Sequence, residues 1–339
     1  MYIEQRKTFL SRSRWATRFL NRRNLLKKAA YGVAGLTLGS SAEGRPSPII
    51  DAHIHLFDTA RPGGVPWPEN SDAVLYQPAL PGRYRTVTKG LGIVGAIAIE
   101  ASPLATDNDW LLRVAGENPI IVGVVGDLVP SDPAYPGDLE RLHTNPLFLG
   151  LRYGNLWNRN LLLDLQKAYF LDGLKLLAQA GLVFESANPD TDLIHALVNI
   201  SEHVPDLRIV VDHLPHASVP AEKTANEEYW SELRTLSQNP RVFVKLSEIP
   251  VRVHGKLVIE PGNYKGSLDA LWNIFGEDRV LFGSDWPNSD HIATYAQTFR
   301  IVREYISGKS TAAAEKFFWK NSFAAYRWRP RSANQTLPG

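Results

Sequence analysis

Short runs that are apolar at every position recur along the chain at a regular interval. The first begins at residue 49 and the last at residue 280, with a mean spacing of about 33 residues, close to the size of one strand-plus-helix unit. Continuously apolar runs are typical of parallel strands that are buried on both faces. The eight expected strands are 49–51, 94–99, 120–125, 148–151, 182–184, 208–211, 242–246 and 280–282.

Stretches with helix-like spacing of apolar residues fill several of the gaps between these runs. Eight strand-helix units predict a single-domain (β/α)₈ TIM barrel over 43–330, a fold of about 250 residues plus insertions. An open doubly wound sheet is the alternative, but it usually has fewer strands. The expected helices are 168–180, 193–203, 229–237, 268–275, 292–306 and 311–326. The segment 56–91 is rich in Pro and Gly, so we expect little helix there and a loop positioned to act as a lid.

Polar residues stand at the ends of most of these expected strands. In a barrel the loops that follow the strands open on one face, where active sites lie. His53 and His55 are two residues apart, so on an extended strand both rings face the same way and suit one metal ion or one substrate oxygen. The other strand-end residues are Glu100, Arg152, Glu185, Asp212, His213, Lys245, Glu248 and Asp285.

The charge of the chain is unevenly distributed. Residues 1–42 carry nine Lys or Arg and one acid, although the whole chain has a net charge of only +2. The stretch 21–27 (NRRNLLK) resembles a twin-arginine export motif, and a weakly apolar stretch and small residues follow it. We therefore expect a signal segment at 1–42 and a periplasmic or exported protein; a basic tail on a cytoplasmic protein is the alternative. Residues 331–339 are expected to form a flexible tail.

Composition excludes several kinds of partner. The chain beyond residue 42 has 28 bases and 34 acids, whereas phosphate binding requires clustered cations, so no nucleic-acid partner is expected. No run approaches the 18 apolar residues of a membrane span. The chain has no cysteine, which excludes disulfides and thiolate ligands. A small-molecule substrate is the expected partner, and the sequence leaves the oligomeric state open.

Three motifs, in the order in which they stand, give the chain a family resemblance. Asp51-x-His53-x-His55, Asp212-His213 and Gly283-Ser284-Asp285-Trp286-Pro287 resemble the amidohydrolase-related family of barrel hydrolases. The best match is the lactonase branch that includes fuconolactonases and 2-pyrone-4,6-dicarboxylate lactonase. Further similarity to this branch is carried by Gly150-Leu151-Arg152, Lys245-Leu246-Ser247 and Asn321, and the likeness covers about 48–327.

The resemblance implies hydrolysis of a small sugar lactone or carboxylated lactone. Asp285 would take a proton from the attacking water, and His53, His55 and His213 would polarise the carbonyl, directly or through a metal. Arg152 would hold a substrate carboxylate or hydroxyl. The remaining candidates for substrate binding are Glu100, Glu185, Lys245 and Trp286.

The number of metal ions is open at this stage. Many superfamily members have metal-ligating histidines on two later strands, whereas only His213 is evident here, so a two-metal site is not expected. His53, His55, His213 and Asp285 could hold one zinc ion with a free position for water; operation without a metal is an equal alternative. The competing functions are a metal-dependent amidohydrolase or decarboxylase of the same superfamily, and a barrel that binds a small molecule without catalysis.

Overall fold

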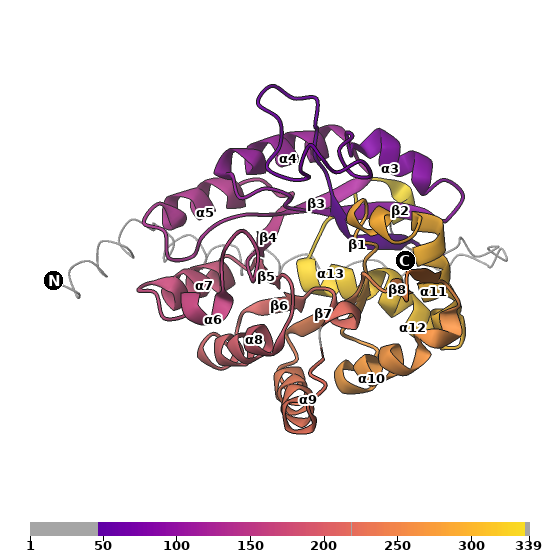
Figure 1. The fold of residues 1–339 in the computed structure, drawn as a ribbon. Helices are drawn as coiled ribbons and strands as arrows, with labels where there is room; N and C mark the ends of the chain where they lie inside the picture. The colour runs from indigo at the N-terminus through magenta and orange to yellow at the C-terminus, as the bar shows by residue number, and fades with distance from the viewer. Residues whose placement is uncertain (1–46, 218, 336–339) are drawn as a thin grey trace, which may run out of the picture.

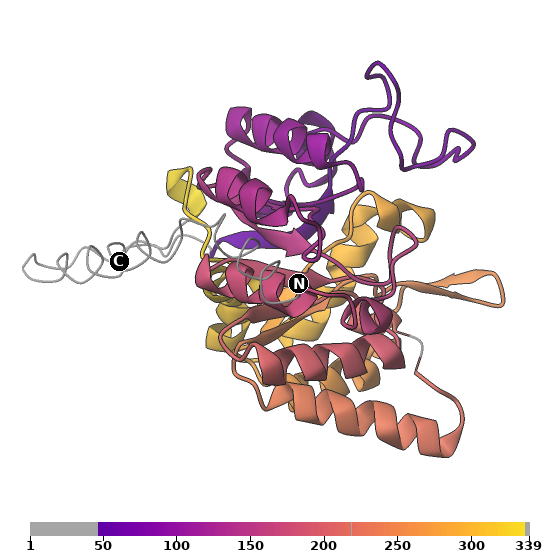
Figure 2. The ribbon, with the colours of Figure 1, turned by 90° about the vertical axis from the view of Figure 1, so that its left-hand side faces the viewer.

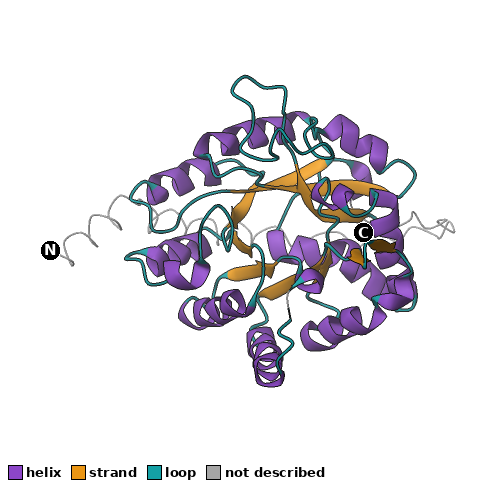
Figure 3. Ribbon diagram, viewed as in Figure 1, coloured by secondary structure: helices purple, strands orange, loops and turns teal. Residues whose placement is uncertain are grey.

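Eight parallel strands form a barrel surrounded by helices in the computed structural model, which describes residues 47–217 and 219–335 (Figures 1 and 3). The (β/α)₈ prediction is confirmed, and each expected strand is present. The barrel strands are β1 (Ile49–His55), β2 (Ile93–Ile99), β3 (Ile121–Gly126), β4 (Phe148–Arg152), β5 (Val183–Ser186), β6 (Arg208–Val211), β7 (Val242–Leu246) and β10 (Val280–Phe282).

The seam between the first and last strands closes the barrel. The backbone N–H of His55 donates to the carbonyl of Trp286 over 2.7 Å, and that of Asp285 donates to the carbonyl of His53 over 2.9 Å. The first strand therefore lies directly beside the chain that follows the last strand. This pairing sets the two histidines of β1 next to Asp285.

A buried carboxylate clamps the same seam. Asp51 Oδ1 accepts a hydrogen bond from the backbone N–H of Ser284 over 2.8 Å. Its Oδ2 accepts from the hydroxyls of Tyr84 and Tyr295 over 3.1 and 2.9 Å. Because both oxygens of this carboxylate have donors, its burial is compensated.

The helices alternate with the strands along the chain and cover the barrel. They are α3 (Pro81–Val87), α4 (Ala105–Glu117), α5 (Tyr135–His143), α6 (Leu161–Asp164), α7 (Phe170–Gln179), α8 (Thr191–His203), α9 (Lys223–Ser237), α10 (Lys265–Phe275), α11 (Tyr295–Ser307), α12 (Thr311–Glu315) and α13 (Asn321–Tyr326). Sequence patterning misses α3, α4, α5 and α6. In α4 one of the buried positions is the polar Asn108, whose amide bonds the backbone of Asp127.

The last expected helix, 311–326, is not continuous. A π-helical turn at Lys316–Lys320 separates α12 from α13. The rings of Phe317 and Phe318, adjacent in sequence, both contact the ring of Phe282, at centroid distances of 6.2 and 6.0 Å. The prediction of one regular helix is therefore wrong at this turn, where two neighbouring aromatic rings face the same core.

The prediction of a flexible tail is wrong for residues 331–335. The Gln335 side chain is fully buried, and its amide donates to the carbonyls of Val94 and Pro119, each over 2.9 Å. Arg331 donates to the carbonyls of Gly116 and Ile121 over 2.8 and 2.7 Å. Residues 336–339 and the expected signal segment 1–42 lie outside the described residues.

Two segments project from one side of the barrel (Figure 2). One is the loop after β1, and the other is the hairpin of β8 (Val251–Val253) and β9 (Lys256–Val258). The two-residue turn His254-Gly255 has φ values of 48° and 75°, which matches the twist of a tight hairpin. Within the described residues, no helix has the length and apolar character that crossing a membrane requires.

Candidate active site

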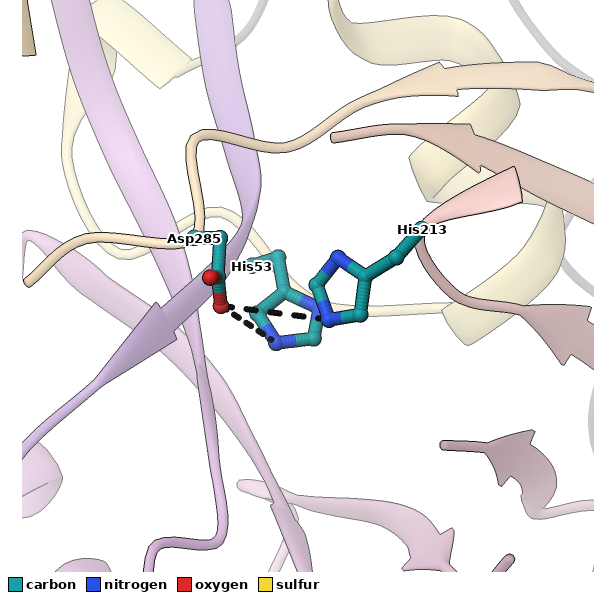
Figure 4. Close-up of side chains that lie close together, drawn as sticks. All are labelled: His53, His213 and Asp285. Atoms are coloured by element: carbon teal, nitrogen blue, oxygen red, sulfur yellow. Dashed lines mark ion pairs between the residues drawn. The ribbon is translucent and has the colours of Figure 1, made fainter. Parts of the chain in front are cut away.

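Three histidines and one aspartate converge at the carboxyl ends of the barrel strands. His53 and His55 come from β1, His213 follows β6 and Asp285 follows β10. Asp285 Oδ1 lies 3.4 Å from His53 Nε2, 3.2 Å from His55 Nε2 and 3.8 Å from His213 Nε2. Figure 4 shows both histidine rings that it draws turned toward this carboxylate. We call these four residues the cavity cluster.

The spacing of the cavity cluster is suitable for one cation. Zinc–nitrogen bonds of about 2.0–2.1 Å in a tetrahedron place the donor atoms about 3.3 Å apart. The separations between the Asp285 carboxylate oxygen and the three imidazole nitrogens, 3.2 to 3.8 Å, are close to this value. Asp285 Oδ1 is buried and accepts no hydrogen bond within the described residues, so a donor or a cation is the partner that it lacks. The residues therefore fit a single divalent ion.

Hydrogen bonds orient two of the imidazoles, and in His55 they leave a lone pair facing Asp285. His55 Nδ1 lies 3.2 and 3.0 Å from the carbonyl oxygens of Ile99 and Glu100. Carbonyls only accept, so Nδ1 carries the proton and Nε2 is left bare. His213 Nδ1 lies 2.8 Å from Ser247 Oγ, a hydroxyl that can donate or accept, so this contact fixes the orientation of the ring. Such support for the outer nitrogen is usual for metal-ligating histidines.

His53 differs from its neighbours because a cation faces its outer nitrogen. Lys245 Nζ lies 3.1 Å from His53 Nδ1. An ammonium has donors only, so Nδ1 accepts and the proton of a neutral His53 ring sits on Nε2. His53 thus presents an N–H group toward His55 Nε2, which lies 3.2 Å away.

Burial sets the protonation of the cavity cluster. It lowers the pKa values of His53 and His213 well below the usual histidine range. Burial, with the charge of Arg152, lowers the pKa of His55 to about 4. All three rings are therefore neutral at neutral pH. Burial also raises the pKa of Asp285 to about 7, against the lowering effects of Asn288 and Arg152, which places it near the value that suits a general base.

A cavity of about 170 Å³ opens above the cluster. Five of its lining residues have a positive φ, between 51° and 61°. This left-handed conformation is uncommon outside glycine, and it concentrates at functional sites. The lining residues are His55, Trp67, Ala101, Arg152, Leu156, Trp157, Asn188, His213, Glu248, Asp285 and Asn288, and those with positive φ are Trp157, Asn188, His213, Glu248 and Asp285.

The cation of the cavity lining is already paired. Arg152 Nε donates to Glu100 Oε1 over 2.7 Å, and Nη1 lies 3.8 Å from Asp212 Oδ2. Glu100 Oε2 also accepts from Trp157 Nε1 over 3.2 Å and from the backbone of Ser102 over 3.0 Å. Glu100, expected to bind substrate, is instead positioned to hold Arg152.

Three further candidates for substrate binding lie away from the cavity. Trp286 is fully buried, and its ring packs on Tyr84 at a centroid distance of 5.3 Å and under Arg83 at 5.3 Å. Glu185 and Lys245 are fully buried beneath His53 and bond one another over 2.7 Å. The side chains of Glu185 and Lys245 point into the barrel core, and Trp286 packs against Tyr84 and Arg83. The geometry therefore gives none of the three a contact with a ligand in this cavity.

Sequence reasoning missed two polar residues of the cavity lining, Asn188 and Asn288. Asn288 Nδ2 donates to Asp285 Oδ2 over 2.8 Å and to Glu248 Oε1 over 3.0 Å. Asn188 follows the end of β5 by two residues, as His213 follows β6 and Glu248 follows β7. This spacing was a usable signal for Asn188, whereas Asn288 begins a short 3₁₀ helix, Asn288–His291, beyond β10.

Comparison with known proteins places the barrel in a family. The amidohydrolase family model matches residues 50–328, and the chain therefore belongs to the amidohydrolase family. The expected membership is confirmed, and the relatives include the lactonases that the motifs resemble. One is an L-fucono-1,5-lactonase of Burkholderia ambifaria, 28% identical over 252 residues, which are 71% of this chain and 80% of the relative. An L-fucono-1,5-lactonase of Burkholderia multivorans is 27% identical over 305 residues, 85% and 98% of the two chains.

Solved structures share the fold at lower identity. An amidohydrolase from Burkholderia multivorans with bound zinc has a TM-score of 0.71 and 22% identity, and covers 83% of this chain and 99% of its own. A probable 2-pyrone-4,6-dicarboxylic acid hydrolase from Acinetobacter baumannii, with bound citric acid, has a TM-score of 0.64 and 16% identity, with the same coverage. Both support the barrel architecture.

Proposed function

We propose that this protein hydrolyses a lactone, with Asp285 as the base that takes the proton of the attacking water. The observation that carries the proposal is the buried Oδ1 of Asp285, which has no hydrogen-bond donor among the described residues and faces neutral imidazoles at the base of a cavity. The L-fucono-1,5-lactonases among the relatives support the same reaction class.

The proposed reaction needs one proton carrier and one oxyanion partner. A water molecule beside Asp285 Oδ1 loses a proton to that carboxylate while its oxygen attacks the lactone carbonyl carbon. The tetrahedral intermediate then breaks the bond to the ring oxygen, which takes the proton back from Asp285. Asn288 holds Oδ2 over 2.8 Å, which fixes the carboxylate so that Oδ1 faces the reacting water.

His53 and Arg152 are suited to stabilise the negative charge that develops on the carbonyl oxygen. The Nε2–H group of His53 is a donor within the cavity cluster, and Arg152 adds a fixed cation at the cavity wall. Donors held in place before the reaction are worth about 10²–10³ in rate each.

A divalent cation fits the same cluster. His53, His213 and Asp285 offer donor atoms within 4.8 Å of one another, and His55 Nε2 lies 3.2 Å from Asp285 Oδ1. These residues would hold the ion, and when bound it would supply Lewis-acid polarisation of the carbonyl. His55 already presents a bare nitrogen, whereas His53 would have to give up its Nε2 proton.

The cavity favours an uncharged sugar lactone over a carboxylated one. Arg152 is the cation of the lining residues, and its charge is balanced by Glu100 and approached by Asp212. Glu248 and Asp285 add acidic groups that disfavour an anionic substituent. The amides of Asn188 and Asn288 match hydroxyl groups, which both donate and accept hydrogen bonds.

A lactone panel tests the proposal directly. The purified protein is assayed with a pH indicator, because ring opening releases an acid, against neutral sugar lactones and a pyrone dicarboxylate, before and after chelation. We expect turnover of neutral sugar lactones and its loss in Asp285→Asn. Turnover that survives in Asp285→Asn contradicts the assigned base, and turnover of the dicarboxylate alone contradicts the assigned substrate class. Turnover that persists after complete chelation assigns the reaction to the side chains.

A further inference from the structure

A second group of potential ligands lies directly beneath the cavity cluster and shares His53 with it. His53 Nδ1 lies 3.7 Å from Glu185 Oε1 and 3.5 Å from Asp212 Oδ1. These three donor atoms lie within 4.8 Å of one another, and all three residues are buried. Their separations are slightly wider than the donor spacing of about 3.3 Å in a tetrahedral zinc site. We call His53, Glu185 and Asp212 the core triad.

The ammonium of Lys245 sits among the three atoms of the core triad. Its Nζ lies 2.7 Å from Glu185 Oε1, 3.1 Å from Asp212 Oδ1 and 3.1 Å from His53 Nδ1. Lys245 is fully buried, and it reaches the triad from the neighbouring strand β7. Its charged end has the same three neighbours that a cation in the triad would have.

Asp212 is the member of the triad whose bonding is incomplete. Neither of its buried oxygens accepts a hydrogen bond of good geometry within the described residues, although Lys245 and Arg152 approach them as ion pairs at 3.1 and 3.8 Å. A carboxylate with charge partners but without directed donors is the environment of a ligand to a cation, for which direction matters less. Glu185, by contrast, also accepts from Tyr326 over 2.6 Å.

We propose that the Lys245 ammonium takes the place of a second metal ion in this protein, so that the core triad is a cation site occupied by the chain itself. Charge balance supports the assignment. Glu100 and Asp212 supply two negative charges, and Glu185, whose pKa burial and Asp212 raise to about 8, supplies at most a third, against two positive charges from Arg152 and Lys245. A divalent ion added to this set would leave excess positive charge, whereas removal of Lys245 leaves at least one negative charge uncompensated.

The same arrangement fixes the tautomer of His53. Because the ammonium donates to Nδ1, the Nε2 atom keeps its proton and faces the cavity cluster as a donor. The lysine therefore restricts the protein to one metal ion at most, held by the cavity cluster. This inference concerns metal binding and does not depend on which lactone is hydrolysed.

Zinc stoichiometry tests the proposal. Wild type, Lys245→Ala and the double variant Lys245→Ala/Glu185→Gln are saturated with zinc, freed of unbound ion by gel filtration and analysed by mass spectrometry for zinc per chain. We expect Lys245→Ala to retain one zinc ion more than wild type and the double variant to return to the wild-type number. A folded Lys245→Ala protein with the wild-type number overturns the proposal.

Two further measurements need no change at Lys245, in case that variant does not fold. Glu185→Gln alone is expected to bind as many zinc ions as wild type, because the triad already holds its cation; the loss of one ion contradicts the proposal. In metal-free wild type, ¹⁵N spectra of labelled histidine are expected to show His53 protonated at Nε2. A proton at Nδ1 contradicts the ammonium as donor.

Discussion

The two clusters that share His53 have similar ligand types but differ in the partners of their carboxylates. The core triad faces the ammonium of Lys245, and its Glu185 has a donor for each carboxylate oxygen. The cavity cluster leaves Asp285 Oδ1 buried without a donor among the described residues. Residue type alone therefore does not separate structure from chemistry in this barrel; the partner of each carboxylate oxygen does.

The difference also explains why one cluster is suited to react. A buried, fully partnered charge network fixes a structure, whereas an unpartnered buried group costs stability of about 1–3 kcal/mol. Proteins keep such groups mainly where function requires them. Asp285 Oδ1 has that cost. Asp212 in the core triad also lacks a directed donor, but Lys245 and Arg152 balance its charge, so variants of the two clusters have opposite expected consequences.

The largest expected effect is at Asp285. Asp285→Asn is predicted to lower kcat for lactone hydrolysis by about 10³-fold, since the proton acceptor is lost, while the melting temperature stays unchanged or rises, because a destabilising buried carboxylate is removed. Steady-state assays and thermal denaturation measure both quantities. Asp290→Asn, in the same turn but paired with Arg83 over 3.0 Å, is the matched control and should keep its activity. A large loss of stability in Asp285→Asn would remove the contrast between the clusters.

The next effect is at the ammonium of the core triad. In the metal-free protein, Lys245→Met leaves Glu185 and Asp212 as buried acids without their shared cation, and is predicted to destabilise the fold by about 3 kcal/mol or more. Chemical denaturation measures the change. Adding Glu185→Gln should recover part of the loss, because one of the two buried acids is removed. Equal stability of wild type and Lys245→Met would show that the ammonium does not balance these acids.

A smaller effect is expected where the core triad contacts the last helix. Tyr326→Phe removes the hydroxyl that donates to Glu185 Oε2 and should cost about 1–3 kcal/mol of stability, with kcat within about twofold of wild type. Tyr229→Phe is the control, because its buried hydroxyl has no hydrogen-bond partner among the described residues. A change in kcat larger than the change in stability explains would link Tyr326 to the reaction.

The smallest effect is expected at Arg152. Arg152→Lys keeps the charge but loses the planar fork that bonds both Oε1 and the backbone carbonyl of Glu100. We predict about a tenfold decrease in kcat/KM for a neutral lactone, with an unchanged preference for neutral over carboxylated substrates. A switch of preference toward a carboxylated lactone would show that Glu100, and not the arginine, sets the charge selectivity of the cavity.

The strands and the reacting residues could be predicted from the sequence because their signals are local. Strands buried on both faces have continuous apolar runs in the sequence, and His53, His55 and Asp285 come soon after such runs. The contrast between the two clusters could not be predicted from the sequence, because it depends on how deep each side chain lies along the barrel axis. Lys245 and Glu185 each lie one residue before the end of their strand, whereas Arg152 ends its strand and Glu248 follows its strand by two residues; this small difference decides whether a side chain enters the core or the cavity.

Other features escaped for different physical reasons. The left-handed backbone at Trp157 and Asn188 turns these side chains into the cavity. In a sequence, only glycine indicates that backbone conformation. The anchoring of residues 331–335 depends on Gln335, a polar residue whose burial is made possible by two backbone carbonyls distant in sequence, those of Val94 and Pro119. Hydrophobic patterning has no means to register such a contact.

The clamp at Asp51 has a consequence for when this protein can fold during translation. Its two carboxylate oxygens accept from Ser284 and Tyr295, which lie 233 and 244 positions further along the chain. A nascent polypeptide that has left the ribosome only as far as β7 can hold neither this clamp nor the base beside it. Synthesis therefore has to be nearly complete before the enzyme can have any activity, and prematurely terminated products should be inert.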